Sequence, residues 1–360
     1  MRVFFRSDAS TQIGSGHVMR CLTFADVLRE KGNECQFICR KHEGHMMSLI
    51  EQRGYRVKAL PTSRKKVKLT GEPEHASWLG CDWKEDAEQT QQAIGSEIIS
   101  WLIVDHYALD HRWHQSLRLS TKHLMVIDDL ADRPLDCELL LDQNFGSSAT
   151  RYAGLVPQGC LQLHGPEYAL LKPVYAKQRA KMQQRTGQIQ RVLIYFGGGA
   201  DHADLTGQSV RAFYNQELSD IHLDVVVSES YAHLFSLHAI AALRGNVSVH
   251  MQLPNLADLM AQSDLAIGAG GTTTWERCCM GLPSIVISIA KNQQPACEAL
   301  AQANLIRYLG HMSSVTIEKI ELEVKRLSRD SSKILALGKS SMGLIDGKGV
   351  IRVAERMRCC

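Results

Sequence analysis

Residues 97–105 read EIISWLIVD, and apart from Ser100 the run from Ile98 to Val104 is wholly apolar. A strand with one face in water alternates apolar and polar residues, whereas a strand covered on both faces is apolar almost throughout. We therefore expect a strand of a parallel sheet that carries helices on both faces and ends at Asp105.

Short strands alternate with helical segments on both sides of this run. Apolar residues recur at helical spacing over residues 17–31, and Gly32 follows where a helix C-cap belongs. In this half we expect strands at 2–6, 36–39, 55–60, 97–105, 123–127 and 138–141, helices at 17–31, 46–52 and 83–95, and an exposed loop at 61–75.

The same alternation resumes at RVLIYFGGG, residues 191–199, where a strand ends in three glycines. Strands are expected at 191–196, 223–227, 247–250, 265–268 and 284–289, with helices beginning near 203, 231, 256, 272 and 295. Alternating strands and helices predict parallel, doubly wound sheets. The fold class is therefore α/β, with two Rossmann-like domains facing a central cleft, at which open sheets of this kind bind ligands.

The interruption between the two patterns suggests the domain boundaries. We expect an N-terminal domain over 1–150, a proline-containing connection over 151–190 and a C-terminal domain over 191–330. Residues 331–360 form an extension to which the sequence assigns no role.

Composition narrows the class of protein. The 360 residues are 44% hydrophobic and 22% charged, which excludes a disordered chain. A net charge of +3, from 41 basic and 38 acidic residues, does not suit a dedicated nucleic-acid partner. No run approaches the ~20 apolar residues that cross a membrane, and the N-terminus lacks the apolar core of a signal peptide. The irregularly spaced cysteines are typical of reduced thiols, so we expect a cytoplasmic protein. As to its assembly, we expect a monomer or a simple homo-oligomer.

The first candidate site is RSDASTQIGSGH, residues 6–17, between the first strand and the first helix. Its glycines let the backbone turn tightly and approach a ligand. The positive end of the helix dipole disfavours an imidazolium at His17, and a neutral imidazole is a usable general base. The pattern also fits an ordinary turn followed by a solvated histidine. The candidates are His17 as the catalytic residue and, for substrate binding, Arg6, Asp8, Gly14, Ser15 and Gly16.

The second candidate site is IGAGGTTTWE, residues 267–276, where a strand ends in glycines and a helix follows. Free backbone N–H groups and the helix dipole favour a diphosphate there, and Glu276 could accept hydrogen bonds from ribose hydroxyls. The alternative is a capping box, in which Thr273 caps the helix and Glu276 reaches back to it. The substrate-binding candidates are Gly270, Gly271, Thr272, Thr273 and Glu276.

Further polar residues follow other strands and would lie at the same sheet edges. Asp105 and Tyr107 end the run quoted first, although Asp105 could simply cap the next turn. Gly198 follows the first strand of the second half, and Asn292 and Gln293 follow the strand at 284–289. We count all five as substrate-binding candidates.

Several familiar motifs are missing from the sequence. The glycines at 14 and 16 lack the third glycine of a dinucleotide fingerprint, and no phosphate-binding Walker loop occurs. No Gly-x-Ser-x-Gly elbow and no Asp-x-Asp clamp is present. We therefore expect no cofactor and no metal.

Taken together, the motifs resemble a known family. RSDA at 6–9, IGSGHVMRCL at 13–22, VDHY at 104–107, IDDL at 127–130, DQN at 142–144, FGGG at 196–199 and KNQ at 291–293 are similar to blocks of the UDP-2,4-diacetamido-2,4,6-trideoxy-β-L-altropyranose hydrolases of pseudaminic acid biosynthesis. The likeness runs from Met1 to about Tyr308. The family in turn resembles GT-B glycosyltransferases, in particular the N-acetylglucosaminyltransferase that forms lipid II. The loop at 61–75 and the tail after Ser328 depart from the family's pattern.

The resemblance implies a GT-B fold and a metal-independent hydrolase, in a pathway that serves flagellin glycosylation. His17 would be the base that deprotonates water, which displaces UDP from the anomeric carbon with inversion. Tyr107 and Asn292 would contact the substrate, and residues 270–274 with Glu276 would hold the nucleotide. Two alternatives stay open: a GT-B glycosyltransferase that uses a UDP-sugar donor, and a non-catalytic nucleotide-sugar binder.

Overall fold

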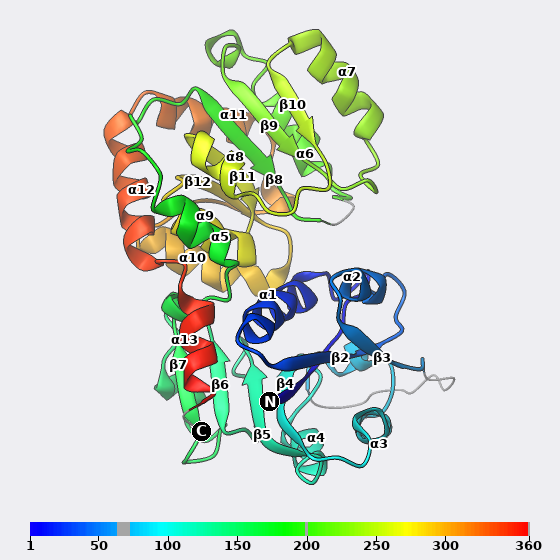
Figure 1. The fold of residues 1–360 in the computed structure, drawn as a ribbon. Helices are drawn as coiled ribbons and strands as arrows, with labels where there is room; N and C mark the ends of the chain where they lie inside the picture. Colours follow the sequence, from blue (N-terminus) through cyan, green and yellow to red (C-terminus); the bar gives the residue numbers. More distant parts are fainter. Residues whose placement is uncertain (63–72, 199–200, 359–360) are drawn as a thin grey trace. The chain divides into compact units, whose positions relative to one another are not determined.

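A computed structural model describes residues 1–62, 73–198 and 201–358 of the chain (Figure 1). The chain forms two compact units: unit 1 comprises Met1–Leu170 and Gly349–Cys360, and unit 2 comprises Leu171–Lys348. The loop expected at 61–75 falls largely outside the described residues, as does Gly199.

Unit 1 is built on a parallel sheet whose strand order is β3-β2-β1-β4-β5-β6-β7. Its strands are β1 (Arg2–Ser7), β2 (Glu34–Arg40), β3 (Arg56–Leu60), β4 (Ile99–Asp105), β5 (Thr121–Ile127), β6 (Leu139–Asp142) and β7 (Leu161–His164). Its helices are α1 (Gly16–Glu30), α2 (Met47–Gln52), α3 (Trp83–Ile94), α4 (His111–Ser116) and α13 (Gly349–Arg356), and its 3₁₀ turns are η1 (Ala76–Leu79), η2 (Ala149–Tyr152) and η3 (Pro166–Tyr168).

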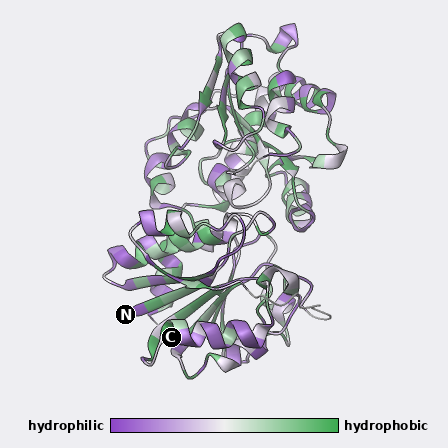
Figure 2. Cartoon of the chain, turned by 90° about the vertical axis from the view of Figure 1, so that its right-hand side faces the viewer, coloured by the Kyte–Doolittle hydropathy of each residue, from purple (hydrophilic) through white to green (hydrophobic). Residues whose placement is uncertain are grey.

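The run quoted first is the strand β4, and it is covered on both faces as its apolarity predicts. Phe5 and Ile103 pack on one face of the sheet in a core that includes α1 and α13. Phe4 and Leu102 pack on the other face in a core that includes α3 and α4. Figure 2 shows the strands largely in the colour of apolar residues, whereas the helices carry both colours.

Unit 2 repeats this architecture and has a hydrophobic core of its own. Its parallel sheet has the order β10-β9-β8-β11-β12-β13. Its strands are β8 (Arg191–Tyr195), β9 (His222–Val226), β10 (Val247–His250), β11 (Leu265–Ala269), β12 (Ser284–Ser288) and β13 (Arg307–His311). Its helices are α5 (Pro173–Arg179), α6 (Leu205–Arg211), α7 (Leu234–Arg244), α8 (Ala257–Gln262), α9 (Thr272–Cys279), α10 (Gln294–Gln302), α11 (Ile317–Ser328) and α12 (Ser331–Leu344), with 3₁₀ turns η4 (Gln216–Leu218), η5 (Lys291–Gln293) and η6 (Met312–Ser314).

In each sheet the chain first adds strands on one side of the first strand and then continues on the other side. In unit 1 the chain moves outward from β1 to β3 and then returns to β4, on the other side of β1. In unit 2 the same reversal separates β8 from β11. Loops that leave the carboxyl ends of two strands at such a point diverge and leave room for a ligand. The loops after β1, β4, β8 and β11 are therefore the first places to look for a site.

The predicted α/β class with two Rossmann-like domains is confirmed, but the units divide the chain differently from the predicted boundaries. Residues 151–170, expected in the connection, supply β7 and η3 of unit 1, and the connection's remainder belongs to unit 2. The extension 331–360 is also shared. Its α12 packs on α9 within unit 2, and α13 returns to unit 1.

Small residues let these last two helices pack closely against their neighbours. A Cβ added at Gly338 of α12 would lie 2.9 Å from the carbonyl oxygen of Gly281, which follows α9. A Cβ added at Gly349 would lie 2.4 Å from the carbonyl oxygen of Ala169. Close backbone approach therefore occurs in the middle of α12 and at the start of α13, and a count of apolar residues does not detect it. The apolar residues Val350, Val353 and Ala354 of α13 also pack into the core of unit 1.

Two expectations from composition can be compared with the structure. Among the helices of the described residues, none has both the length and the apolarity that a bilayer crossing needs. The cysteines of the described ranges are free thiols, and all of them are buried except Cys160, which is half-buried.

Candidate functional site

The loop after β1 places His17 at the start of α1. The loop is closed by a hydrogen bond from the Gly14 amide to the Ser10 carbonyl (2.9 Å), and Gly14 adopts a φ of +80° that favours glycine. The helix then begins at Gly16, preceded by Ser15, whose side chain makes no cap hydrogen bond. His17 is 8% exposed.

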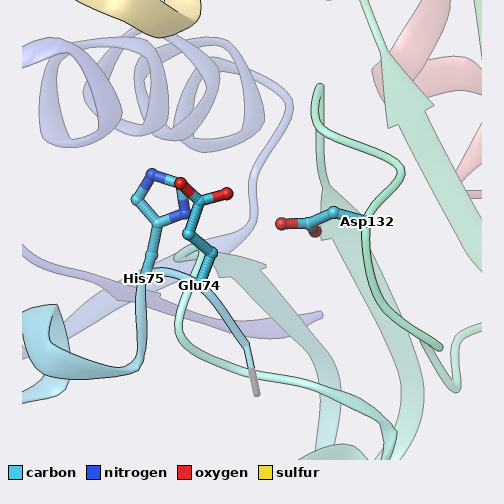
Figure 3. Close-up of side chains that lie close together, drawn as sticks. All are labelled: Glu74, His75 and Asp132. Carbon is cyan, nitrogen blue, oxygen red and sulfur yellow. The ribbon is translucent and has the colours of Figure 1, made fainter. Parts of the chain in front are cut away.

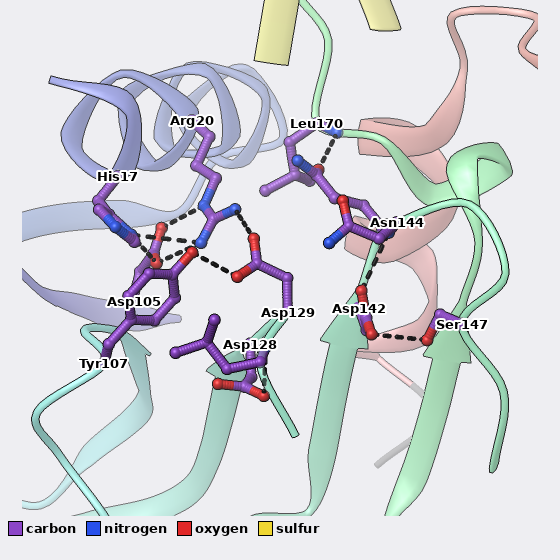
Figure 4. A network of polar contacts seen from close by, with 12 residues as sticks. His17, Arg20, Asp105, Tyr107, Asp128, Asp129, Asp142, Asn144, Ser147 and Leu170 are labelled. Atoms are coloured by element: carbon purple, nitrogen blue, oxygen red, sulfur yellow. Dashed lines mark hydrogen bonds and ion pairs between the residues drawn. The ribbon is translucent and has the colours of Figure 1, made fainter. Parts of the chain in front are cut away.

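The imidazole of His17 is paired with the carboxylate that ends β4. Nδ1 of His17 lies 2.6 Å from Oδ1 of Asp105, which is fully buried (Figure 4). The pairing follows from the sheet order, because β1 and β4 are neighbours and Ser7 stands opposite Asp105 in their register. Asp105, expected to bind substrate, is therefore enclosed behind His17 and holds its ring.

Arg20 holds the same carboxylate from the next turn of α1. Its Nε lies 2.6 Å from Oδ2 of Asp105 and its Nη2 lies 2.7 Å from Oδ1, a two-pronged ion pair. Its Nη1 reaches Asp129, which follows β5, at 3.2 Å. Because residues three apart share one face of a helix, His17 and Arg20 meet one acidic cluster together.

The electrostatics of this cluster determine which nitrogen of His17 carries a hydrogen. Burial alone would raise the pKa of the Asp105 carboxyl, but the charge of Arg20, the neighbouring His17 and their hydrogen bonds bring that pKa below its ordinary value. An ionised carboxylate only accepts hydrogen bonds, so Nδ1 of His17 carries the hydrogen in a neutral ring. Nε2 then keeps its lone pair, and among the described residues no hydrogen bond occupies it.

Aromatic side chains form one wall beside His17. The Tyr107 ring lies edge-to-face with the imidazole, with centroids 4.6 Å apart, and Trp78 lies 6.4 Å from it. The Tyr107 hydroxyl donates to Asp129, so Arg20 and Tyr107 share this carboxylate. Burial and the Asp129 charge raise the pKa of Tyr107, which keeps the hydroxyl protonated.

Arg6 and Asp8, predicted to bind substrate, are fully buried in an ion-pair network. Nη2 of Arg6 lies 2.7 Å from Asp86 and its Nη1 lies 2.7 Å from Asp8, whose Oδ1 also accepts from the Arg40 amide at 2.6 Å. The sequence could not show these partners because Asp86 and Arg40 come from α3 and β2. In this structure the pair joins three elements, and neither side chain is open to a ligand.

A group that the sequence did not predict lies next to the aromatic wall. Glu74, His75 and Asp132 bring one ligand atom each to within 4.8 Å of one another (Figure 3). His75 also contacts Tyr107, with ring centroids 5.3 Å apart. One imidazole and two carboxylates can hold a divalent ion, but both carboxylates belong to exposed residues, and Asp132 is already paired with Arg133 at 2.7 Å.

In unit 2 the glycines after β11 lead into α9 as predicted, but the capping box is wrong. The helix begins at Thr272, and its N-cap is Gly271, which has a φ of +119° and offers no side chain. Thr273 therefore lies inside the helix, and the backbone amides at its start receive no side-chain cap. Gly271 is exposed, and Thr272 and Thr273 are half-buried.

Gln293 closes one side of this loop. Its Oε1 accepts a hydrogen bond from the Ile289 amide (3.0 Å), and a Cβ added at Gly270 would lie 3.4 Å from the same oxygen. Its neighbour Asn292 lies in η5 and is exposed, as is Gly198 after β8. Because Gly268 stands opposite Tyr195 in the register of β11 and β8, the loops after these strands are adjacent.

Glu276 lies one turn into α9. Burial raises the pKa of its carboxyl to about 7, although a hydrogen bond from Tyr175 and the charge of Lys172 oppose this shift. Tyr175 belongs to α5, directly after the chain enters unit 2. A carboxyl with this pKa changes charge near neutral pH.

Sequence reasoning missed Arg20 and Trp78 as parts of the site and mentioned Asp129 without including it among the candidates. Arg20 lies three residues after His17, a spacing that indicates a shared helix face. Asp129 directly follows a strand, as Asp105 ends one. Trp78 carried no such signal, because it belongs to the 3₁₀ turn η1 outside the regular pattern.

Comparison with known proteins supports the resemblance found in the sequence. No family model matches the chain. The chain is 26% identical over 302 residues to the UDP-2,4-diacetamido-2,4,6-trideoxy-β-L-altropyranose hydrolase of Campylobacter jejuni, across 84% of this chain and 97% of that protein. It is 27% identical over 190 residues to the spore coat polysaccharide biosynthesis protein SpsG of Bacillus subtilis, across 52% of this chain and 56% of that protein.

Solved structures share the fold across the whole chain. MurG of Acinetobacter baumannii matches with a TM-score of 0.67 and 11% identity, over 100% of this chain and 99% of that one. LpCGTa, solved in complex with UDP, matches with a TM-score of 0.65 and 12% identity, over 100% and 99% of the two chains. These neighbours confirm the expected GT-B fold class.

Proposed function

We propose that this chain hydrolyses a UDP-sugar by attack of water on the anomeric carbon, in the pathway to pseudaminic acid. The observation that carries the proposal is the pair formed by His17 and Asp105. It leaves Nε2 of a neutral imidazole as a base at the carboxyl edge of a doubly wound sheet. The name of the Campylobacter jejuni relative supports UDP-2,4-diacetamido-2,4,6-trideoxy-β-L-altropyranose as the substrate.

The proposed step keeps atoms and charges balanced. Nε2 of His17 takes a proton from water while the water oxygen bonds to the anomeric carbon. The bond between that carbon and the β-phosphate oxygen breaks, and UDP leaves with the electron pair. Attack opposite the leaving group inverts the anomeric centre. Asp105 stabilises the imidazolium that forms, and Arg20 keeps Asp105 ionised.

The nucleotide half of the proposal rests on unit 2. The uncapped start of α9 and the exposed Gly271 suit the diphosphate, and Glu276 suits the ribose hydroxyls. Thr272 and Thr273 would add hydroxyl donors, while Asn292 and Gln293 would approach from η5. UDP is a good leaving group, so neutralising its developing charge is the main task of this half.

The deciding experiment measures UDP release from a panel of UDP-sugars in buffer, with no acceptor alcohol present. We expect release from the diacetamido sugar, and we expect His17→Ala to lose about 10²–10⁴-fold in rate while keeping its fold. Hydrolysis in ¹⁸O water should place the label in the sugar, whereas label in UDP would mean attack on phosphorus. A chelator should change nothing. Loss of rate restored by Mn²⁺ would instead indicate a metal-dependent reaction, for which Glu74, His75 and Asp132 are candidate ligands.

A second function has a specific observation in its favour, because a structural neighbour with a TM-score of 0.66 and 14% identity is named the glycotransferase of kitacinnamycin. A transferase would release UDP only when an acceptor is added. A nucleotide-sugar binder without catalytic activity would bind UDP and show no turnover under either condition. The same panel, run with and without a set of acceptor alcohols, therefore separates the three functions.

A further inference from the structure

Arg277 lies in the last turn of α9, and its buried guanidinium reaches back to the first turn of that helix. Its hydrogen bonds in the described part of the chain all go to neutral oxygens. Only 2% of the residue is exposed. Its Nη2 donates to the Ala269 carbonyl (2.8 Å) and to the Thr274 hydroxyl (3.0 Å), and its Nη1 donates to the Thr273 hydroxyl (3.4 Å). Its Nε has no partner among the described residues.

A charge in this position is unfavourable in the molecule by itself. Burial without a paired carboxylate penalises an ion and lowers the pKa of Arg277. The neighbouring Cys278 and Cys297 do not neutralise it, since burial raises their thiol pKa values to about 12 and about 11. Glu276 has its pKa raised to about 7, so it supplies only part of a negative charge near neutral pH.

The direction of the side chain adds to this penalty. Helical side chains lean toward the helix N-terminus, and Arg277 reaches back to Thr273 and Thr274 in the first turn of α9. This is the positive end of the helix dipole, where a cation is disfavoured and an anion is favoured. Space is also kept for the guanidinium, because a Cβ at Gly268 would lie 2.8 Å from Nη1.

We propose that Arg277 is a positioning residue for a diphosphate: its buried charge acts through the first turn of α9 and raises the affinity of that turn for the anion. This inference rests on the proposed function, whose nucleotide would occupy the same turn. The inference adds Arg277 to the nucleotide site as a residue that need not touch the ligand. The Thr273 hydroxyl, which accepts from Arg277 and belongs to a half-buried residue, would then be free to donate its own hydrogen to a phosphate oxygen.

The other end of α9 offers a matched control. Arg185 donates to the carbonyls of Met280 and Gly281, directly after the helix, through Nη1 at 2.9 Å in both cases. Its hydrogen bonds also go to neutral oxygens, but it stands at the negative end of the dipole, where a cation is favoured. Arg185 itself precedes β8 and contacts α9 only through its side chain. Replacing either arginine by methionine therefore removes one positive charge from beside α9, at the positive end of the helix dipole for Arg277 and at the negative end for Arg185.

The test titrates the full chain and its variants with UDP, inorganic pyrophosphate and uridine by calorimetry. For Arg277→Met we expect UDP and pyrophosphate affinity to fall about tenfold or more, uridine affinity to change less than twofold, and the thermal midpoint to hold or rise. Arg277→Lys should keep most of the UDP affinity. Arg185→Met should lower the thermal midpoint and leave UDP affinity within about twofold.

Three results would overturn the inference: unchanged UDP affinity in Arg277→Met, an equal loss of UDP and uridine, or a wild-type chain that binds neither UDP nor pyrophosphate. Failure of the proposed function is distinguishable from these. A chain that binds UDP in the expected Arg277-dependent way and releases none from any UDP-sugar would refute the hydrolase and leave the role of Arg277 standing.

Discussion

Nδ1 of His17 lies 2.6 Å from Oδ1 of Asp105, across the two neighbouring strands at which the chain reverses direction in unit 1. The contact fixes both the ring orientation and the position of its hydrogen. It also makes the two residues one functional unit, so the loss of either should disable the same step.

Asp105→Asn should reduce UDP release by about 10²–10⁴-fold. The amide can donate to Nδ1, which would move the imidazole hydrogen to Nε2 and remove the lone pair that accepts the proton from water. Steady-state rates on the diacetamido substrate check this. A thermal melt of the variant is the control for folding, because Asp105→Asn also removes the carboxylate that pairs with Arg20.

The double variant His17→Ala with Asp105→Asn separates this account from simple damage to the fold. Groups that act as a unit are strongly non-additive, so the double variant should be about as slow as His17→Ala alone. If the two losses multiplied instead, Asp105 would be acting independently of His17.

Tyr107 should matter more for its ring than for its hydroxyl. Its ring packs edge-on against His17, whereas its hydroxyl donates to Asp129, which Arg20 also holds. We expect Tyr107→Phe to lower the rate less than about tenfold and Tyr107→Ala to lower it more, since the alanine removes the wall beside the imidazole. Equal losses in both variants would show that the hydroxyl itself takes part in the reaction.

Much of this site could be predicted from the sequence because loops after parallel strands meet at one edge. His17 and Tyr107 lie in segments that follow a strand, Asp105 ends one, and the structure brings the three together. The α9 loop was predicted for the same reason, from glycines that follow a strand and precede a helix. Such motifs can be recognised locally in the sequence, and they lie close together in the fold because the strands that precede them are neighbours in the sheet.

The remainder depended on partners that are distant in the sequence. Arg6 looked like a ligand for an anion, yet Asp86, eighty residues later, neutralises it inside the unit. The packing of α12 depends on close backbone contact between Gly338 and Gly281, and neither position carries an apolar side chain to detect. Charge pairing and close approach are properties of the assembled unit, so reading the chain in order did not reveal them.

Uridine affinity should rise with pH through about 7. The Glu276 carboxyl is protonated below that pH and ionised above it, and the ionised form accepts the stronger hydrogen bonds from ribose hydroxyls. Between pH 6 and pH 8 we expect about a tenfold increase, measured with uridine because a phosphate itself titrates near pH 6. Glu276→Gln should flatten the profile. Tyr175→Phe should move its midpoint upward, since the Tyr175 hydrogen bond favours the ionised carboxyl.

The Glu276 carboxyl should affect the stability of the fold in the opposite direction to uridine affinity: stability should fall as pH rises. Its pKa rises from an ordinary 4.5 to about 7 on folding, so between these values the folded chain binds a proton that the unfolded chain has released. The free energy of unfolding should therefore fall as pH rises through this window, by at most about 3 kcal/mol, and level off above it. Denaturant titrations should show this fall in the wild type and a smaller one in Glu276→Gln. A wild type whose stability rises over the same window more than that of the variant would contradict the assignment.

Gly270 should tolerate no side chain as long as Cys297 stands behind it. A Cβ there would lie 2.6 Å from Sγ of Cys297 and 3.4 Å from Oε1 of Gln293, so Gly270→Ala should destabilise the chain by about 1–3 kcal/mol and weaken UDP binding. Replacing Cys297 by alanine in the same chain removes the obstructing sulfur and should recover most of the lost stability. Gly16→Ala is the matched control, because an added Cβ there meets no atom within 4 Å. If the effects of the two substitutions on the free energy of unfolding were simply additive, contact with Cys297 would not explain the glycine at position 270. The glycine would then be required for ligand binding rather than for packing of the loop after β11.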